Sequence, residues 1–304
     1  MILGIEIGGT KLQLGVSDGF SRDLIATERT TVQRADGAVG ILHQIEVLAA
    51  RLLEKYAVQA IGVGFGGPLD SIAGVVYKSH QVEGWDGFDL KKWFHQKYSL
   101  PVAVANDCDV AALAEATWGA GQGKDSVFYV TVGTGIGGGS VNGGRLMGVG
   151  RPAMAEVGHL RLGLPATEPD STVEAISSGL GIAKMARVCQ SEKNWQPDAP
   201  THQLTAERVG CLALGGDLQA ISILRRATDT LGWAIAQVIT LNAPDIIVIG
   251  GGVSHIGEDL FLSPLRESTC RYVFPPLVNS YRILPSALGE SVVIHGAVAL
   301  ARQL

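Results

Sequence analysis

The sequence has few cysteines, few charges and no long apolar run. Its four cysteines are widely scattered and form no CxxC or CxC pair, which excludes a zinc knuckle or a redox pair of that kind. Buried free thiols in a reducing compartment are the plain interpretation. No apolar run is long enough to span a bilayer, and no charged segment followed by an apolar one has the pattern of a signal peptide. These absences predict a cytoplasmic protein that makes no membrane contact.

Charge is also scarce. Charged residues make up 17% of the chain and the net charge is −5, so no basic surface points to nucleic acid. Hydrophobic residues make up 46% of the 304 positions, which allows a large core and argues against disorder. This length is enough for two domains of ordinary size.

The sequence does contain apolar strands that run into glycines. In residues 127–141, VFYVTVGTGIGGGSV, a buried strand leads into a turn at Gly133, Thr134 and Gly135. Glycines let backbone N–H groups close on a ligand, and such a turn can present amides and a hydroxyl to phosphate. A plain tight hairpin is an equal alternative from this stretch alone.

The same pattern occurs near the N-terminus and again late in the chain. Residues 2–16, ILGIEIGGTKLQLGV, carry a strand into Gly8, Gly9, Thr10 and Lys11, and a shift of 125 positions aligns the two hairpins. Residues 245–254, DIIVIGGGVS, form a third strand that ends in glycines. This repetition predicts a duplicated unit with a ligand between the copies, its polyphosphate on the first two turns and its nucleoside on the third.

Two acidic residues lie at the ends of predicted strands. Glu6 sits in an apolar strand, and a buried carboxylate there needs a partner, either Lys11 or a hydrated Mg²⁺. Asp107 follows the strand predicted at 101–105 and opens a helix. It serves either as a helix cap or as a ligand-binding group at the edge where open α/β sheets bind ligands. Further helices are predicted at 36–56, 172–188, 218–241 and 292–304.

Taken together, the motifs resemble those of the ROK sugar kinases, glucokinase-like members of the actin/hexokinase/Hsp70 ATPase superfamily. The matching stretches are IEIGGTK at 5–11, GFGGPLD at 64–70, EGW at 83–85, VANDCDVAALAEATWGAG at 104–121, GTGIGGG at 133–139, EVGH at 156–159 and IGGGVS at 249–254. They cover nearly the whole chain in the family's order and spacing, and that combination is highly specific.

The resemblance implies an α/β fold of two ribonuclease-H-like, actin-like ATPase domains with a cleft between them. The expected domains are residues 1–118 and 119–290, with a C-terminal helix at 291–304 that packs back on the first. The implied reaction transfers the γ-phosphoryl group of ATP to a hexose hydroxyl, usually at C6, with Mg²⁺ accompanying the ATP. Glucose is the first substrate to try. A homodimer or larger homo-oligomer is expected, because the family often forms them.

Site residues carry over position by position. Asp107 matches the family's catalytic base, which accepts the proton of the attacking hydroxyl. The positions that match sugar contacts are Gly66, Gly67, Asn106, Asp107, Glu156, His159 and Glu174. The positions that match the nucleotide site are Gly9, Thr10, Lys11, Gly133, Thr134, Gly135, Gly251, Gly252 and Val253.

Three departures from the family pattern stand out. Glu6 replaces the usual Asp, and Gln81 stands where many members carry an Asn that contacts sugar. Many members also place CxCGxxGCxE after EVGH and bind zinc with it, whereas no cysteine lies between His159 and Glu174 here. We therefore predict no structural zinc, and something else must orient His159.

Two other functions are compatible with these motifs. A non-catalytic sugar sensor on the same fold would explain the departures at Glu6, Gln81 and the zinc motif, although a pure binder needs no base at Asp107. A different ATPase of the superfamily would keep the glycine turns, but EVGH and Glu174 favour sugar. The family's transcriptional repressors carry an added DNA-binding domain, which is not expected here because the sequence opens directly on the first strand.

Overall fold

The structure, a computed structural model, describes residues 1–79, 82–151, 154–168, 170–192, 195–197 and 200–304. The chain forms two compact units. Unit 1 comprises Met1–Tyr129, Gly139–Met154 and Ala287–Leu304, and unit 2 comprises Val130–Gly138 and Ala155–Ser286. The predicted domain boundary between 118 and 119 stays a prediction. Within the described residues, no helix is long and apolar enough to cross a membrane, and the cytoplasmic location stays a prediction.

Unit 1 is built on a five-stranded sheet in the order β3-β2-β1-β4-β7. Its strands are β1 (Ile2–Ile7), β2 (Lys11–Ser17), β3 (Ala26–Thr31), β4 (Ala60–Phe65) and β7 (Val102–Asn106). The β1–β2 and β2–β3 pairs are antiparallel, while β1–β4 and β4–β7 are parallel. A small hairpin joins β5 (Leu69–Asp70) to β6 (Val75–Val76). The helices are α1 (Gly37–Leu53), α2 (Leu90–Tyr98), α3 (Asp107–Trp118) and α9 (Val292–Ala301).

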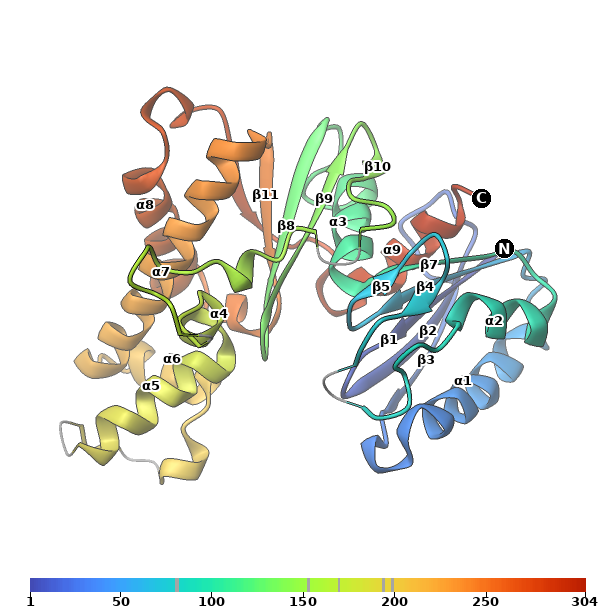
Figure 1. Ribbon diagram of the computed structural model, residues 1–304, viewed down its shortest axis with the longest axis horizontal. Coiled ribbons are helices and arrows are strands. Elements are labelled where there is room, and N and C mark those ends of the chain that lie inside the picture. Colours follow the sequence, from blue (N-terminus) through green and yellow to red (C-terminus); the bar gives the residue numbers. More distant parts are fainter. Residues whose placement is uncertain (80–81, 152–153, 169, 193–194, 198–199) are drawn as a thin grey trace. The chain divides into compact units, whose positions relative to one another are not determined.

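A row of glycines lets α9 lie directly on this sheet (Figure 1). Gly4 of β1 pairs with Gly15 of β2 on one side and with Gly62 of β4 on the other. A methyl group added at Gly62 would lie 1.8 Å from the carbonyl oxygen of Ala297, and one at Gly4 would lie 2.6 Å from that of Ile294. The backbone of α9 contacts the backbone of β1 and β4 directly, because these glycines have no side chains to hold the helix away. This close contact defines where the C-terminal helix packs on the sheet.

The second sheet has the order β10-β9-β8-β11-β12. Its strands are β8 (Ser126–Val132), β9 (Ile136–Asn142), β10 (Arg145–Leu146), β11 (Ile246–Gly250) and β12 (Arg282–Pro285). Counted along each set of five, the strands of both sheets are arranged third, second, first, fourth and fifth. The shared order matches the duplication predicted from the two hairpins. The helices of unit 2 are α4 (Glu174–Ser177), α5 (Gly179–Ser191), α6 (Ala206–Leu214), α7 (Leu218–Asn242) and α8 (Ser263–Tyr272).

Two segments differ from the sequence-based expectation. The single helix predicted over 172–188 is two helices, because Ser178 is extended at ψ 167° and its hydroxyl caps α5 by accepting from Gly181 N. The polar stretch 191–203 contains two prolines, and its sequence predicts an exposed loop, but its described residue Trp195 anchors it. That indole is buried and donates to Asp217 Oδ2 at 2.8 Å.

Candidate active site

Unit 1 gathers its predicted sugar-binding residues at one edge of the sheet. The parallel strands β1, β4 and β7 all end there, and Gly66 N donates to the carbonyl of Ile7, joining two of the strand ends. The Asn106 amide donates to Gly67 O at 3.0 Å, which ties the third strand end to the same place. Carboxyl ends of parallel strands are where open α/β sheets bind ligands.

Asp107 occupies the first turn of α3 beside this edge. Its Oδ1 and the Oδ1 of Asn106 both accept from Cys108 N at 2.8 Å, so Asn106 is the helix cap and Asp107 supports it. The sequence left cap and ligand as alternatives for Asp107. Its second oxygen, Oδ2, would lie only 3.4 Å from a methyl group placed on Gly66, so it faces the strand ends. The helix dipole favours negative charge at this position.

Glu6 is a buried carboxylate with partners in its own unit. Lys11 Nζ lies 3.2 Å from Oε1, and the Gln13 amide donates to Oε2 at 2.9 Å. Burial raises the pKa of the Glu6 carboxyl, Lys11 and Gln13 oppose that rise, and the charge of Asp107 adds to it. Lys11 also donates to Glu290 O at 3.0 Å, so the lysine is fixed in this network rather than freely solvated.

The first glycine turn is closed by a hydrogen bond from Gly8 N to Lys11 O at 3.0 Å. Two other carbonyl groups of this turn also accept hydrogen bonds: Thr10 O accepts from Val32 N, and Gly9 O accepts from Arg34 Nε. Sequence reasoning missed Arg34, since nothing in its neighbourhood marks a cation beside a phosphate turn. The assignment of Gly9, Thr10 and Lys11 to phosphate stays a prediction.

In unit 2, the second glycine turn is fixed by helix α5. Gly133 N donates to Gly135 O at 2.9 Å, and Gly133 O accepts from Gly179 N at 2.7 Å. The third turn lies against the same strand end. Gly251 has a left-handed φ of 85°, and a methyl group there would lie 2.5 Å from Val132 O. Only glycine therefore suits this position.

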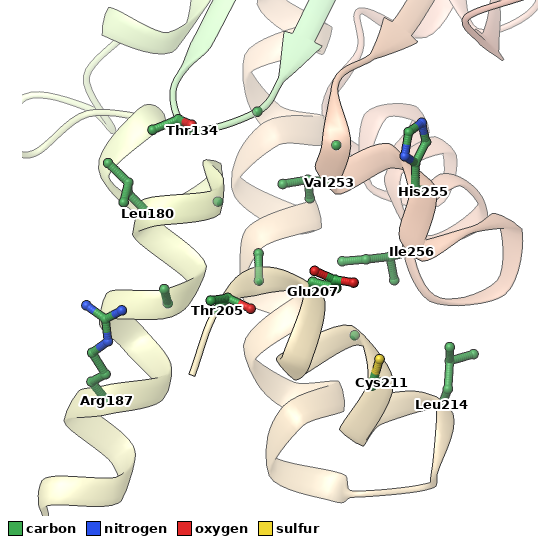
Figure 2. A pocket seen from close by; sticks show the side chains of 16 residues that line it. Thr134, Leu180, Arg187, Thr205, Glu207, Cys211, Leu214, Val253, His255 and Ile256 are labelled. Carbon is green, nitrogen blue, oxygen red and sulfur yellow. The ribbon is translucent and has the colours of Figure 1, made fainter. Parts of the chain in front are cut away.

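A pocket of about 820 Å³ opens between these turns and the helices of unit 2 (Figure 2). It is lined by Gly133, Thr134, Gly179, Leu180, Ala183, Arg187, Thr205, Ala206, Glu207, Gly210, Cys211, Leu214, Gly252, Val253, His255 and Ile256. Four of these, Gly133, Thr134, Gly252 and Val253, are among the predicted nucleotide-binding residues, and Gly135 and Gly251 adjoin them in sequence. The pocket therefore brings the second and third glycine turns to one place.

The pocket is apolar along much of its wall and polar at defined points. Leu180, Val253 and Ile256 supply apolar surface, while Arg187 comes from α5 and Glu207 from α6 (Figure 2). Such a lining suits a ligand with a flat apolar part and a polar end. Sequence reasoning missed α6 altogether, although Thr205 is an N-cap that accepts from Arg208 N. The sequence signal for this helix was Thr205, a common N-cap residue, followed by Glu207 in the first helical turn.

Outside the pocket lining, unit 2 holds a separate polar group made of Glu156, His159 and Glu174. His159 Nδ1 lies 3.5 Å from Glu156 Oε2, and Glu174 Oε2 accepts from Ile136 N at 2.6 Å. Burial raises the pKa of the Glu156 carboxyl, His159 opposes this, and the charge of Glu174 adds to it. A methyl group on Gly158 would lie 2.3 Å from Ile136 O, so the group sits against the start of β9.

Ala155, just ahead of this group, has a left-handed φ of 63°. A non-glycine residue there stores strain, and strained residues cluster at functional sites. Among the residues the structure describes, no group of three or more His, Cys, Asp or Glu is placed to hold a metal. The absence of structural zinc stays a prediction, and Gln81, at one predicted departure, lies outside the described residues.

The predicted site residues therefore fall into two sets. Unit 1 holds Gly9, Thr10, Lys11, Gly66, Gly67, Asn106 and Asp107, and unit 2 holds Gly133, Thr134, Gly135, Glu156, His159, Glu174, Gly251, Gly252 and Val253. A model of the ROK family matches residues 2–304, which is almost the whole chain. The chain belongs to the ROK family. The resemblance drawn from its motifs is thereby confirmed.

Three known proteins illustrate the similarity. A glucokinase of Halalkalibacterium halodurans is 31% identical, with 99% of this chain and 94% of that protein covered. A beta-glucoside kinase of Listeria monocytogenes is 35% identical, with 88% and 86% covered. The structure of a ROK glucokinase from Streptomyces griseus with glucose and AMPPNP superposes with a TM-score of 0.83 at 28% identity, covering 100% and 99%. The predicted α/β fold of actin-like ATPase domains is confirmed by this match.

Proposed function

We propose that this ROK chain is an ATP-dependent hexose kinase that uses Asp107 as its general base, with glucose as the first candidate substrate and C6 as the hydroxyl. The observation that carries the proposal is the placement of Asp107. It lies where three parallel strands end, next to the fixed Asn106 amide and with one oxygen facing Gly66. Relatives named as glucokinases, one of them crystallised with glucose and an ATP analogue, support the same reading.

The nucleotide belongs to unit 2 in this proposal. The apolar wall of the pocket takes the adenine and ribose, while the turn at Gly133 and Thr134 takes the phosphates. Backbone amides of a glycine turn bind phosphate oxygens well because no side chain keeps them at a distance. In this proposal unit 1 supplies the base and unit 2 supplies the nucleotide pocket.

Asp107 acts by accepting the proton of the attacking sugar hydroxyl as the γ-phosphoryl group is transferred. In phosphoryl transfer most of the catalysis comes from positioning and charge stabilisation, so the base must be held in place. The hydrogen bond from Cys108 N to Asp107 Oδ1 provides that restraint, while Asp107 Oδ2 faces the strand ends. Asn106, Glu156, His159 and Glu174 would hold the remaining hydroxyls. A polar site of this kind rejects analogues that lack a hydroxyl.

Mg²⁺ would accompany the ATP and neutralise charge on the phosphates. The carboxylates of unit 1 suit a hydrated ion better than a directly coordinated one. Both oxygens of Glu6 already have partners, Lys11 at 3.2 Å and Gln13 at 2.9 Å, so Glu6 would face the hydration shell of the ion. This matches the preference of Mg²⁺ for keeping several waters.

The experiment that tests the proposal is ADP release with Mg-ATP across glucose, mannose, fructose, allose, N-acetylglucosamine and N-acetylmannosamine. A beta-glucoside is added because one relative is a beta-glucoside kinase. Turnover stimulated strongly by one sugar is expected. Calorimetric binding of a sugar without turnover would instead identify a sensor, and no response to any sugar by either method would contradict a sugar-related function.

A second experiment tests the nucleotide pocket alone. The expectation of buried thiols is wrong for Cys211 and Cys270, which are both exposed. Cys211 lines the pocket, whereas Cys270 in α8 lies outside it. Mg-ATP should slow alkylation of Cys211 and leave Cys270 unchanged, as read by peptide mass mapping of the same sample. Equal rates at Cys211 with and without nucleotide would contradict this placement.

A further inference from the structure

The segment between His159 and Glu174 is a closed loop whose two ends carry predicted sugar-binding residues. Arg161 and Thr172 form an isolated antiparallel bridge, and Val173 N donates to Leu160 O at 3.0 Å. The loop therefore leaves and returns at one point. The loop directly connects the predicted sugar-binding residues His159 and Glu174.

The loop is held from within by one guanidinium group. Nη1 of Arg161 lies 2.6 Å from Thr167 O, 2.7 Å from Glu168 O and 3.2 Å from Ala166 O. The nitrogen carries two N–H groups, which match the two short contacts, and the longer contact shares one of them. The carbonyl groups of three successive residues therefore accept hydrogen bonds from the Arg161 guanidinium.

Short local turns support this arrangement. Gly163 N donates to Arg161 O, Ala166 N donates to Gly163 O, and Ser171 N donates to Glu168 O. In sequence, these turns flank the carbonyls that accept from Arg161. A thiolate metal cluster is not available as an alternative restraint, because no cysteine lies between His159 and Glu174.

We propose that Arg161 is the positioning residue of the sugar site, ordering the loop that fixes His159, Glu156 and Glu174 without a metal ion. The expected effect on the KM for sugar rests on the proposed function, whereas the expected effect on the order of the loop does not. The side-chain hydrogen bonds that Arg161 makes within the described residues all go to the loop and none goes to His159, Glu156 or Glu174, so it acts through the loop. Its effect should fall on sugar binding and spare the nucleotide pocket, whose lining contains no loop residue.

The size of the effect follows from the exposure of the contacts. Hydrogen bonds from a charged donor are stronger than neutral ones, but these lie at the surface and are partly replaced by water. Loss of the two short bonds in Arg161→Ala should raise the KM for sugar about fivefold to tenfold. The KM for ATP should not change, and kcat should change less than the KM for sugar.

Arg271→Ala is the matched control, because Arg271 lies in the same unit and forms an exposed ion pair with Asp229 at 3.6 Å, its one side-chain ion pair or hydrogen bond among the described residues. Methylguanidinium added to Arg161→Ala should lower the KM for sugar toward the wild-type value and do nothing for Arg271→Ala. Arg161→Lys should recover little, since an ammonium lacks the planar fork. Dialysis of the wild type against a chelator, followed by Mg²⁺ alone, should leave the KM for sugar unchanged.

Hydrogen exchange of the full-length protein without ligands provides the readout that needs no activity. Amides in the loop should exchange faster in Arg161→Ala than in wild type or in Arg271→Ala, while α5 and α7 stay unchanged. Unchanged loop exchange would overturn the proposal, and so would faster exchange with an unaltered KM for sugar. If the wild type binds no sugar, the proposed function fails instead, and the exchange data still decide whether Arg161 orders the loop.

Discussion

Gly135 and Gly133 offer a paired test of how the second turn is coupled to the predicted sugar site. A methyl group added at Gly135 would lie 2.5 Å from Glu174 Oε2, whereas one added at Gly133 would meet nothing within 4 Å. Neither glycine has a left-handed φ, so alanine fits the backbone at both positions. The two substitutions are therefore the same chemical change with and without a collision.

The collision would displace the end of a flexible side chain, so the steric cost itself is small. The main loss is the hydrogen bond from Ile136 N to Glu174 Oε2, which is 2.6 Å long. A hydrogen bond to a charged group contributes about 1.5–3 kcal/mol, and partial exposure of Glu174 reduces this to about 1–2 kcal/mol. If Glu174 holds a sugar hydroxyl, that loss raises the KM for sugar by roughly fivefold to thirtyfold.

The assay measures the KM for sugar and for ATP in Gly135→Ala, Gly133→Ala and wild type. Gly135→Ala should raise the KM for sugar, and Gly133→Ala should leave it unchanged. Equal sugar KM values in the two variants would refute the coupling between this turn and Glu174. A rise confined to the KM for ATP would place Glu174 outside the sugar site.

Two further predictions concern packing and pH. Gly62→Ala would force a methyl group to within 1.8 Å of Ala297 O. The free energy of unfolding, measured by urea denaturation, should therefore be about 3 kcal/mol lower than in the wild type. An unchanged denaturation midpoint would mean that α9 does not lie on β4 this closely. Burial raises the pKa of Glu156, His159 opposes the rise and Glu174 adds to it, and the ionised carboxylate is the form that accepts from sugar hydroxyls. The acid limb of kcat/KM for sugar should therefore move to higher pH in His159→Asn and to lower pH in Glu174→Gln, and shifts in the same direction would disprove this assignment.

The strands and the glycine turns could be predicted from sequence because their causes are local. An apolar run predicts a strand, and glycines at its end predict a turn, which located β1, β8 and β11 closely. The long helix α7 (Leu218–Asn242) followed from its apolar stripe in the same way. The repeated hairpin predicted a duplicated unit, and the two sheets share one strand order.

Other features could not be predicted because they depend on contacts between distant residues. The break at Ser178 combines a local N-cap with a distant contact, because Gly179 N donates to Gly133 O, 46 positions away in the chain. Arg34 and Arg161 likewise act on carbonyls whose positions only the fold defines. The predicted sugar and nucleotide residues could be assigned by motif, but the hydrogen bonds that hold their side chains and backbone in place required the structure.

The most direct test of the account is the sugar-dependent release of ADP by Asp107→Asn, beside Asp109→Asn as a control with the same charge change in the first turn of the same helix. If Asp107 is the general base, its variant should retain sugar binding by calorimetry while kcat falls by about 10²-fold or more. Asp109→Asn should keep most of the wild-type rate. Turnover by Asp107→Asn at a rate near that of the wild type would contradict the central claim.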